Sequence, residues 1–239
     1  MIGIYDHHPE TALKLSRRFH PALPLLSRKQ IVSRSQLLIE AASSGAVAEF
    51  LPEVIRQRKS MLVLSTGGLV QNPQLLRKAA ARNIPIYLPS GALAGLDGIK
   101  AGSAGTLHSV TLMTRKPPAA FSGAPEVKRR GIRLSRIRRA RVLFEGPASK
   151  AVRAFPQNIN VAATLALAGL GSRRTRVKIV ADPLVRQNIH EVEAIGDFGR
   201  LRVRVENKPA PENPKTSRLA VLSAIATLKQ ILQPIRVGT

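Results

Sequence analysis

The chain has 239 residues, 44% of them hydrophobic, which is enough for one large domain or two small ones with a sizeable core. It contains no cysteine, which excludes disulfide bonds, cysteine nucleophiles, iron–sulfur clusters and cysteine-based zinc sites. The formal net charge of +24 attracts polyanions, including nucleic acids, but it does not indicate a fold.

The first part of the chain alternates short apolar runs with helical patterns. Strands that alternate with helices of this length indicate parallel βαβ units. Several of the strands are continuously apolar, which is typical of a sheet covered on both faces. We therefore expect an α/β domain over residues 1–94. The predicted strands are 2–6, 36–42, 60–66 and 84–92, and the predicted helices are 9–19, 45–58 and 72–83.

The pattern changes after this domain. Strands and helices are no longer in regular alternation, which indicates an α+β second domain over residues 95–212. A last helix is predicted over 213–232, in a C-terminal segment, 213–239, that could pack back on the first domain. The predicted strands of the second domain are 106–118, 140–146, 175–183, 190–199 and 200–207, and its predicted helices are 147–156 and 158–171.

No targeting or membrane segment is visible in the sequence. The first apolar run is interrupted too early for a secretory signal, and the longest apolar stretches are too short to span a bilayer. A cytoplasmic protein without membrane attachment is the expectation.

A strongly basic segment, residues 125–141, is predicted to lie between the two domains. It contains eight lysines and arginines and no aromatic residue. It could bind nucleic acid or another anion, or it could be a solvated basic insertion. The lack of aromatic residues for base stacking favours the solvated insertion.

No glycine-rich phosphate-binding loop marks a dinucleotide site. The only G-x-G is Gly169-Leu-Gly171, which ends a helical run and therefore fits a helix C-cap better. Asp6 ends the predicted strand 2–6, where an acidic residue can hydrogen-bond the ribose hydroxyls of a dinucleotide. Any aspartate can end a strand, so both interpretations of Asp6 stay open.

Other polar positions could also carry chemistry. His190 sits where a polar loop meets a strand, and it could transfer protons near neutral pH or be a structural histidine. Lys215 is predicted in the first turn of the last helix, where its charge is unfavourable for the helix dipole. An anionic partner such as a substrate carboxylate would explain it, and so would plain solvent exposure. The five histidines show no convergent partners, so no metal site is predicted.

Seven stretches between residues 36 and 230 form a characteristic ordered set: "LPSGALAGLD", "TRKPP", "VLFEG", "FPQNINVAATLALAG", "VKIVADP", "NIHEVEA" and "ENPKTS". Together they resemble the L-aspartate dehydrogenase family. The resemblance implies a Rossmann-like cofactor domain joined to an α+β catalytic domain, assembled as a homodimer. It also implies oxidation of L-aspartate by NAD or NADP to iminoaspartate, which feeds NAD biosynthesis or hydrolyses to oxaloacetate and ammonia.

The resemblance also assigns roles to single residues. His190 matches the family's catalytic histidine, and Ala92 and Asn160 match its nucleotide-contacting positions. Asp6 matches the ribose-binding acidic position only by its placement after a strand.

A dicarboxylate substrate requires cations, for which Lys215 and either Arg115 or Lys116 are candidates. The choice between NAD and NADP stays open, because Asp6 favours NAD while the nearby Arg17 and Arg18 leave room for a 2′-phosphate.

One departure from the family pattern is large. Members begin with a strand, a glycine-rich loop and a helix before the strand that resembles 2–6, and this unit of about 25–30 residues is missing here. The expected fold is therefore an N-terminally incomplete Rossmann-like domain plus an α+β domain. Three hypotheses follow. The chain is an aspartate dehydrogenase whose sequence starts here at an internal methionine, or a homologue that has lost cofactor binding and acts as a non-catalytic binding protein. The least favoured hypothesis is a basic nucleic-acid-binding protein.

Overall fold

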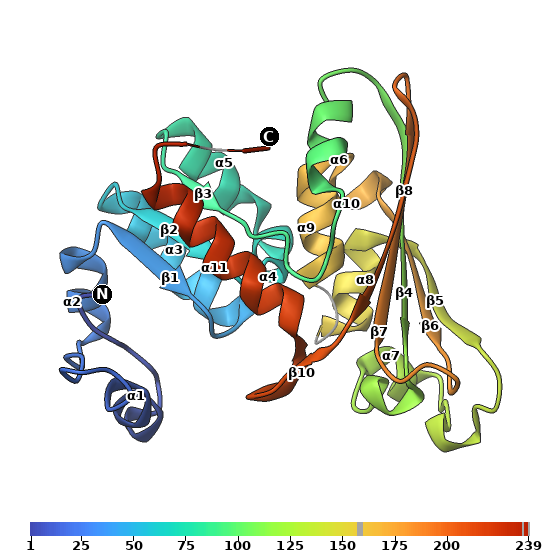
Figure 1. Ribbon diagram of the computed structural model, residues 1–239, viewed down its shortest axis with the longest axis horizontal. Helices are drawn as coiled ribbons and strands as arrows, with labels where there is room; N and C mark the ends of the chain where they lie inside the picture. The colour runs from blue at the N-terminus through green and yellow to red at the C-terminus, as the bar shows by residue number, and fades with distance from the viewer. Residues whose placement is uncertain (157–159, 236, 239) are drawn as a thin grey trace.

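The computed structural model describes residues 1–156, 160–235 and 237–238, apart from the side chains of 214 and 215 (Figure 1). Two hydrophobic cores divide the molecule, one around a small parallel sheet and one under a larger mixed sheet. Within the described residues, no helix combines the length and the apolar character needed to cross a membrane.

The first sheet is parallel, as the βαβ pattern predicts, with strand order β1-β2-β3. Helix α3 shows how the sequence builds it. The Ser43 side chain caps the helix by accepting the N–H of Ala46 at 3.2 Å, and Val47, Leu51 and Val54 lie fully buried at helical spacing. The elements of this part are α1 (Pro9–Ser16), α2 (Arg28–Arg34), β1 (Leu37–Glu40), α3 (Ser44–Arg56), β2 (Ser60–Val63), α4 (Gly67–Gln71), α5 (Pro73–Ala81) and β3 (Ile86–Tyr87).

The predicted strand 2–6 is wrong as a member of this sheet. Only Ile4 pairs, in one isolated parallel bridge with Leu25. The N–H of Ile4 donates to the carbonyl of Pro24, and the N–H of Leu26 donates to that of Ile4, both at 2.9 Å. The bridge does not grow into a ladder because the opposing segment contains two prolines, which have no N–H to donate.

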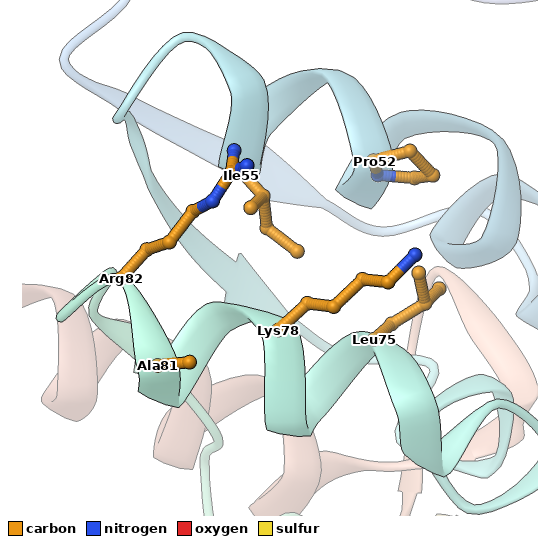
Figure 2. A pocket seen from close by; sticks show the side chains of 6 residues that line it. All are labelled: Pro52, Ile55, Leu75, Lys78, Ala81 and Arg82. Atoms are coloured by element: carbon orange, nitrogen blue, oxygen red, sulfur yellow. The ribbon is translucent and has the colours of Figure 1, made fainter.

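An outer hollow of about 350 Å³ lies between α3 and α5. Figure 2 shows Lys78 and Arg82 reaching from α5 toward α3 over an otherwise apolar lining. This lining includes no carboxylate or histidine.

The second sheet is mixed, with strand order β5-β6-β4-β7-β8. Strand β4 pairs in parallel with β6 and antiparallel with β7, and β7 and β8 form a hairpin. One face is covered by helices that lie between this sheet and the first domain (Figure 1). The elements are α6 (Leu96–Gly102), β4 (Leu107–Lys116), β5 (Arg141–Pro147), α8 (Ala148–Ala154), α9 (Asn160–Ala168), α10 (Gly171–Arg174), β6 (Arg176–Ala181), β7 (Asn188–Gly196) and β8 (Gly199–Asn207).

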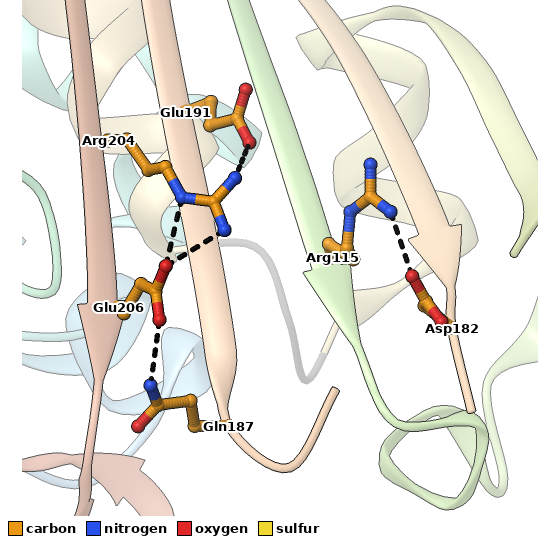
Figure 3. Close-up of polar contacts among 6 residues, drawn as sticks. All are labelled: Arg115, Asp182, Gln187, Glu191, Arg204 and Glu206. Carbon is orange, nitrogen blue, oxygen red and sulfur yellow. Dashed lines mark hydrogen bonds and ion pairs between the residues drawn. The ribbon is translucent and has the colours of Figure 1, made fainter. Parts of the chain in front are cut away.

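The opposite face of this sheet carries charged side chains that pair across the strands (Figure 3). Arg204 on β8 donates to its cross-strand neighbour Glu191 on β7 at 2.7 Å and to Glu206 at 2.8 Å. Exposed pairs of this kind contribute at most about 1 kcal/mol each, so they act mainly in fixing strand register.

The basic segment 125–141 lies within the second domain, between β4 and β5, and its predicted place between the domains is wrong. It folds as α7 (Pro125–Arg129) and a short 3-10 turn, Leu134–Arg136, after another 3-10 turn, Pro118–Phe121. Its eight basic residues are exposed, while Val127 and Ile137 are buried in the core. This arrangement is that of a solvated insertion held by apolar anchors.

The C-terminal part contains β9 (Pro209–Ala210), β10 (Asn213–Ser217) and α11 (Arg218–Leu232). Lys215 lies in β10, so its predicted position in the first helical turn is wrong. Antiparallel pairing of Asn213 with Ala210 keeps the backbone extended up to Ser217, which occupies the N-cap position of α11. Helix α11 then runs back across the first domain, as Figure 1 shows.

Candidate active site

A cavity of about 370 Å³ lies where the two domains and the start of α11 meet. Its first wall is formed by the carboxyl ends of β1, β2 and β3, through residues 41–42, 63–66, 89 and 91–92. Its second wall comes from β4, β7 and α9, and Ala220 and Val221 of α11 close one side.

The first wall fits a dinucleotide cofactor. Ligands of open α/β sheets bind outside the carboxyl ends of the parallel strands, and all three strands end here. The side chains on this wall are mostly small, with Ala41, Ala42, Ser65, Gly91 and Ala92 among them, so a planar ring can approach the backbone closely. Ala92 is 5% exposed, and its carbonyl accepts a hydrogen bond from Asn207 at 3.2 Å.

His190 lies on the second wall and is only 2% exposed. Its Nδ1 lies 3.1 Å from the hydroxyl of Thr114, the residue opposite it on β4. Burial, and then the positive charge of Lys116, lower the pKa of His190 to about 3. The imidazole is therefore neutral at physiological pH, which is the state in which it can accept a proton.

Lys116 ends β4 two residues after Thr114 and shares its face of the sheet, because side chains alternate along a strand. It is 8% exposed, and burial lowers the pKa of its ammonium group to about 8. A mostly protonated lysine beside a neutral histidine gives the cavity one cation and one base.

Arg115 projects to the opposite face of β4 and does not line the cavity (Figure 3). Its Nη1 donates to Asp182 at 2.8 Å. The backbone N–H of Leu184 and the guanidinium of Arg115 lower the pKa of the Asp182 carboxyl below its usual value, although burial acts in the opposite direction. Of the two alternatives that the sequence left open, the structure therefore brings Lys116 and not Arg115 to the site.

Asn160 is the first residue of α9 and connects the two walls. Its side-chain Oδ1 accepts the N–H of Gly67 at 3.2 Å, and its carbonyl accepts the hydroxyl of Thr66 at 2.9 Å. It also lines the cavity, so the structure places Asn160, Ala92 and His190 around one space.

One predicted residue, Asp6, is not brought to this group. Asp6 is not among the residues that line the cavity, and its Oδ1 accepts the N–H of His8 at 2.8 Å just before α1. The side chain of Lys215 lies outside the described residues. Among the described residues, no cluster of three or more His, Asp or Glu could hold a metal ion.

Sequence reasoning missed three buried polar residues here: Thr66 and Thr164, which line the cavity, and Glu40, which holds two residues of its first wall. All three are at most 5% exposed, although residues of these types normally lie at the surface. A carboxylate that directly follows the apolar run of β1 was a signal for Glu40. Neither threonine carries a comparable signal.

Comparison with known proteins agrees with this geometry. Residues 97–231 match the family described as "Aspartate dehydrogenase, C-terminal", and residues 1–89 match "Homoserine dehydrogenase, NAD binding domain". An L-aspartate dehydrogenase of Methanosarcina barkeri is 48% identical over 245 aligned residues, which cover 100% of this chain and 90% of that protein. The chain belongs to the aspartate dehydrogenase family. The predicted resemblance is thereby confirmed.

Other members of the family extend the match. An L-aspartate dehydrogenase of Nitrosopumilus maritimus is 39% identical over 99% of this chain and 89% of its own length. The crystal structure of aspartate dehydrogenase from Thermotoga maritima superimposes with a TM-score of 0.77 at 27% identity, covering 99% of this chain and 89% of that one. Similarity over the whole chain does not favour the alternatives of a non-catalytic homologue or a nucleic-acid-binding protein.

The buried histidine makes the stability of this family member depend on pH. Below pH 6.5 the unfolded chain protonates His190, whereas the folded protein does so only near pH 3, so stability falls as the pH decreases through this window. From pH 6.5 to about 5, wild type should lose about 2 kcal/mol more unfolding free energy than His190→Asn. Urea unfolding at both pH values measures the difference, and equal losses would show that His190 titrates normally in the folded state.

Proposed function

We propose that this chain oxidises L-aspartate to iminoaspartate with NAD or NADP, and that iminoaspartate then hydrolyses to oxaloacetate and ammonia. The main observation behind this proposal is that a neutral, buried His190 lies beside Lys116 in one cavity. Across this cavity it faces the carboxyl ends of a parallel sheet. The family of the chain supports the same reaction and the same cofactor class.

The bound nicotinamide supplies the hydride-accepting chemistry. The chain supplies the proton acceptor, because the substrate ammonium group must lose a proton as its C=N bond forms. When Nδ1 of His190 donates to the Thr114 hydroxyl, Nε2 is the basic nitrogen that accepts this proton or activates water against the imine. General-base assistance contributes about 10²–10⁴-fold to the rate when the pKa of the base lies near the working pH, and the carboxylates of a bound substrate would raise the pKa of the imidazole toward that range.

Substrate recognition falls to Lys116 in this proposal. A carboxylate of L-aspartate carries the charge opposite to the buried ammonium group of Lys116, and the attraction between them is stronger in a buried cavity than in water. Lys215 stays a prediction for a second carboxylate contact.

Cofactor binding falls to Ala92 and Asn160, supported by their places on the cavity. Asn160 has an amide nitrogen as donor, while its Oδ1 accepts from Gly67. Asp6 stays a prediction for the ribose contact.

The test is a steady-state assay of the purified chain with L-aspartate and each cofactor, following formation of reduced nicotinamide. We expect turnover with L-aspartate and little with L-alanine, which lacks the second carboxylate. Equal rates with both amino acids would contradict recognition of the side-chain carboxylate at this site, and no reduction of either cofactor would contradict the proposed function.

The homodimer, the cytoplasmic location and the supply of iminoaspartate to NAD biosynthesis stay predictions from the family resemblance. Light scattering on the eluting gel-filtration peak measures the first. A molar mass near twice the 25.8 kDa of the chain is the expected result, and a mass near that of one chain would contradict it.

A further inference from the structure

A buried carboxylate binds together the loops that follow β1 and β2. Glu40, 5% exposed, accepts the N–H of Ala42 at 2.8 Å. It also accepts the N–H and the hydroxyl of Ser65, at 2.9 and 2.8 Å. Both loops belong to the first wall of the cavity, called the cofactor wall from here on. The Glu40 carboxylate therefore sets the distance between these two loops.

The next residue, Thr66, continues the chain of hydrogen bonds into the other domain. Its hydroxyl donates to the carbonyl of Asn160 at 2.9 Å and accepts from the hydroxyl of Thr164 at 3.0 Å. The N–H of Gly67 donates to Oδ1 of Asn160. Donor and acceptor capacity of the Thr66 hydroxyl are both used, in a side chain that is 2% exposed.

Close packing behind these bonds leaves little room for movement. Helix α4 begins at Gly67 and contacts α3 of its own domain as well as α8 and α9 of the other. A Cβ at Gly68 would lie 2.8 Å from the carbonyl oxygen of Ser44 and 2.9 Å from Cβ of Val47. Only glycine permits this close approach of α4 to α3, the helix on which the Thr66 end of α4 rests.

We propose that Glu40, Ser65, Thr66, Asn160 and Thr164 form an interdomain clasp that holds the cofactor wall at a fixed distance from His190, with Glu40 and Thr66 as positioning residues. This inference rests on the proposed function. Hydride transfer requires reacting atoms about 3–3.5 Å apart, and a misplacement of about 1 Å can cost about 10²-fold in rate. Asn160 belongs both to the clasp and to the cavity, so it couples the two.

Thr66→Val tests the clasp, because valine keeps the shape of threonine and removes the hydroxyl. We expect kcat to fall by about 10- to 100-fold with a KM for aspartate within about threefold of wild type. The deuterium isotope effect on kcat with C2-deuterated aspartate should rise, because hydride transfer becomes slower than the other steps. Thr66→Ser, which keeps the hydroxyl, should restore kcat to within about threefold of wild type.

A matched control removes a hydroxyl elsewhere. Thr227 on α11 donates to the carbonyl of Ser223 at 2.9 Å, away from the clasp, and Thr227→Val should leave kcat and the isotope effect unchanged. Thermal unfolding of each variant confirms that it is folded at the assay temperature. Equal losses in Thr66→Val and Thr66→Ser, or an unchanged isotope effect in Thr66→Val, would overturn the proposal.

Hydrogen–deuterium exchange tests the clasp without any turnover. In Thr66→Val, peptides that contain Gly67 and residues 161–166 should exchange faster than in wild type, while those of β7 should not. Unchanged protection would overturn the clasp even in an active enzyme. Lack of aspartate oxidation by wild type, together with the expected exchange, would instead overturn the proposed function and leave the contact between the domains intact.

Glu40→Gln provides a second, independent variant. The glutamine amide group would face the donors of Ala42 and Ser65 with one carbonyl oxygen instead of two carboxylate oxygens. A kcat loss of about tenfold or more with a raised isotope effect supports the proposal. A folded variant with wild-type kcat would remove Glu40 from the clasp.

Discussion

Replacement of His190 by asparagine is expected to lower kcat for L-aspartate oxidation by about 10²–10⁴-fold. Asparagine can keep a hydrogen bond to Thr114 but is not a base, so the variant removes proton acceptance while preserving the local contact. KM for the cofactor should change little, because the variant leaves Ala92 and Asn160 in place.

A matched control for this variant is His108→Asn. His108 lies on the same strand as Thr114, but its side chain is 56% exposed and pairs with Asp197. Its replacement should leave kcat unchanged. A fall of less than about threefold in His190→Asn would show that the imidazole is structural.

The pH profile gives a second measure of the same residue. Since the pKa of His190 is lowered to about 3, kcat/KM should stay level as the pH falls through 6.5, and should not drop as it would for an ordinary exposed histidine. A clear acidic limb near pH 6.5 that disappears in His190→Asn would contradict the buried, neutral state.

Replacement of Lys116 by methionine should raise KM for L-aspartate by at least about 30-fold, because removing one partner of a buried charge pair costs about 2–5 kcal/mol of binding.

The control for charge alone is Lys178→Met on β6. Lys178 pairs with Glu145 at 3.4 Å and does not line the cavity, so its loss should leave KM unchanged. A rise in KM common to both variants would indicate a general electrostatic effect of this basic chain instead of a specific contact.

Lys116 should also produce the alkaline limb of the profile. Its protonated form, which binds the substrate carboxylate, is lost as the pH rises through about 8. In Lys116→Arg the charge persists, and kcat/KM should stay level well above pH 8. An unchanged limb in this variant would assign the titration to another group.

Much of the fold follows from periodicity. The alternation of apolar runs and helical patterns predicted the parallel sheet β1-β2-β3 with its helices, and the hairpin of β7 and β8. Errors arose where backbone hydrogen bonding overrode the local pattern. Residues 2–6 have strand composition but face prolines, and residues 213–217 have helix-start composition but pair with β9. Short helices such as α4 and α6 have too few residues for a periodic signal.

The sequence by itself determined the family, the absence of cysteine chemistry and the candidacy of His190, because ordered motifs and composition do not depend on coordinates. Only the tertiary structure decided between Arg115 and Lys116, since the choice rests on which face of β4 is covered. It alone gave His190 its neutral state and joined Glu40 and Thr66 to Asn160. Burial and hydrogen bonds between residues 25 to 98 positions apart arise from packing, and no local pattern of side chains encodes them.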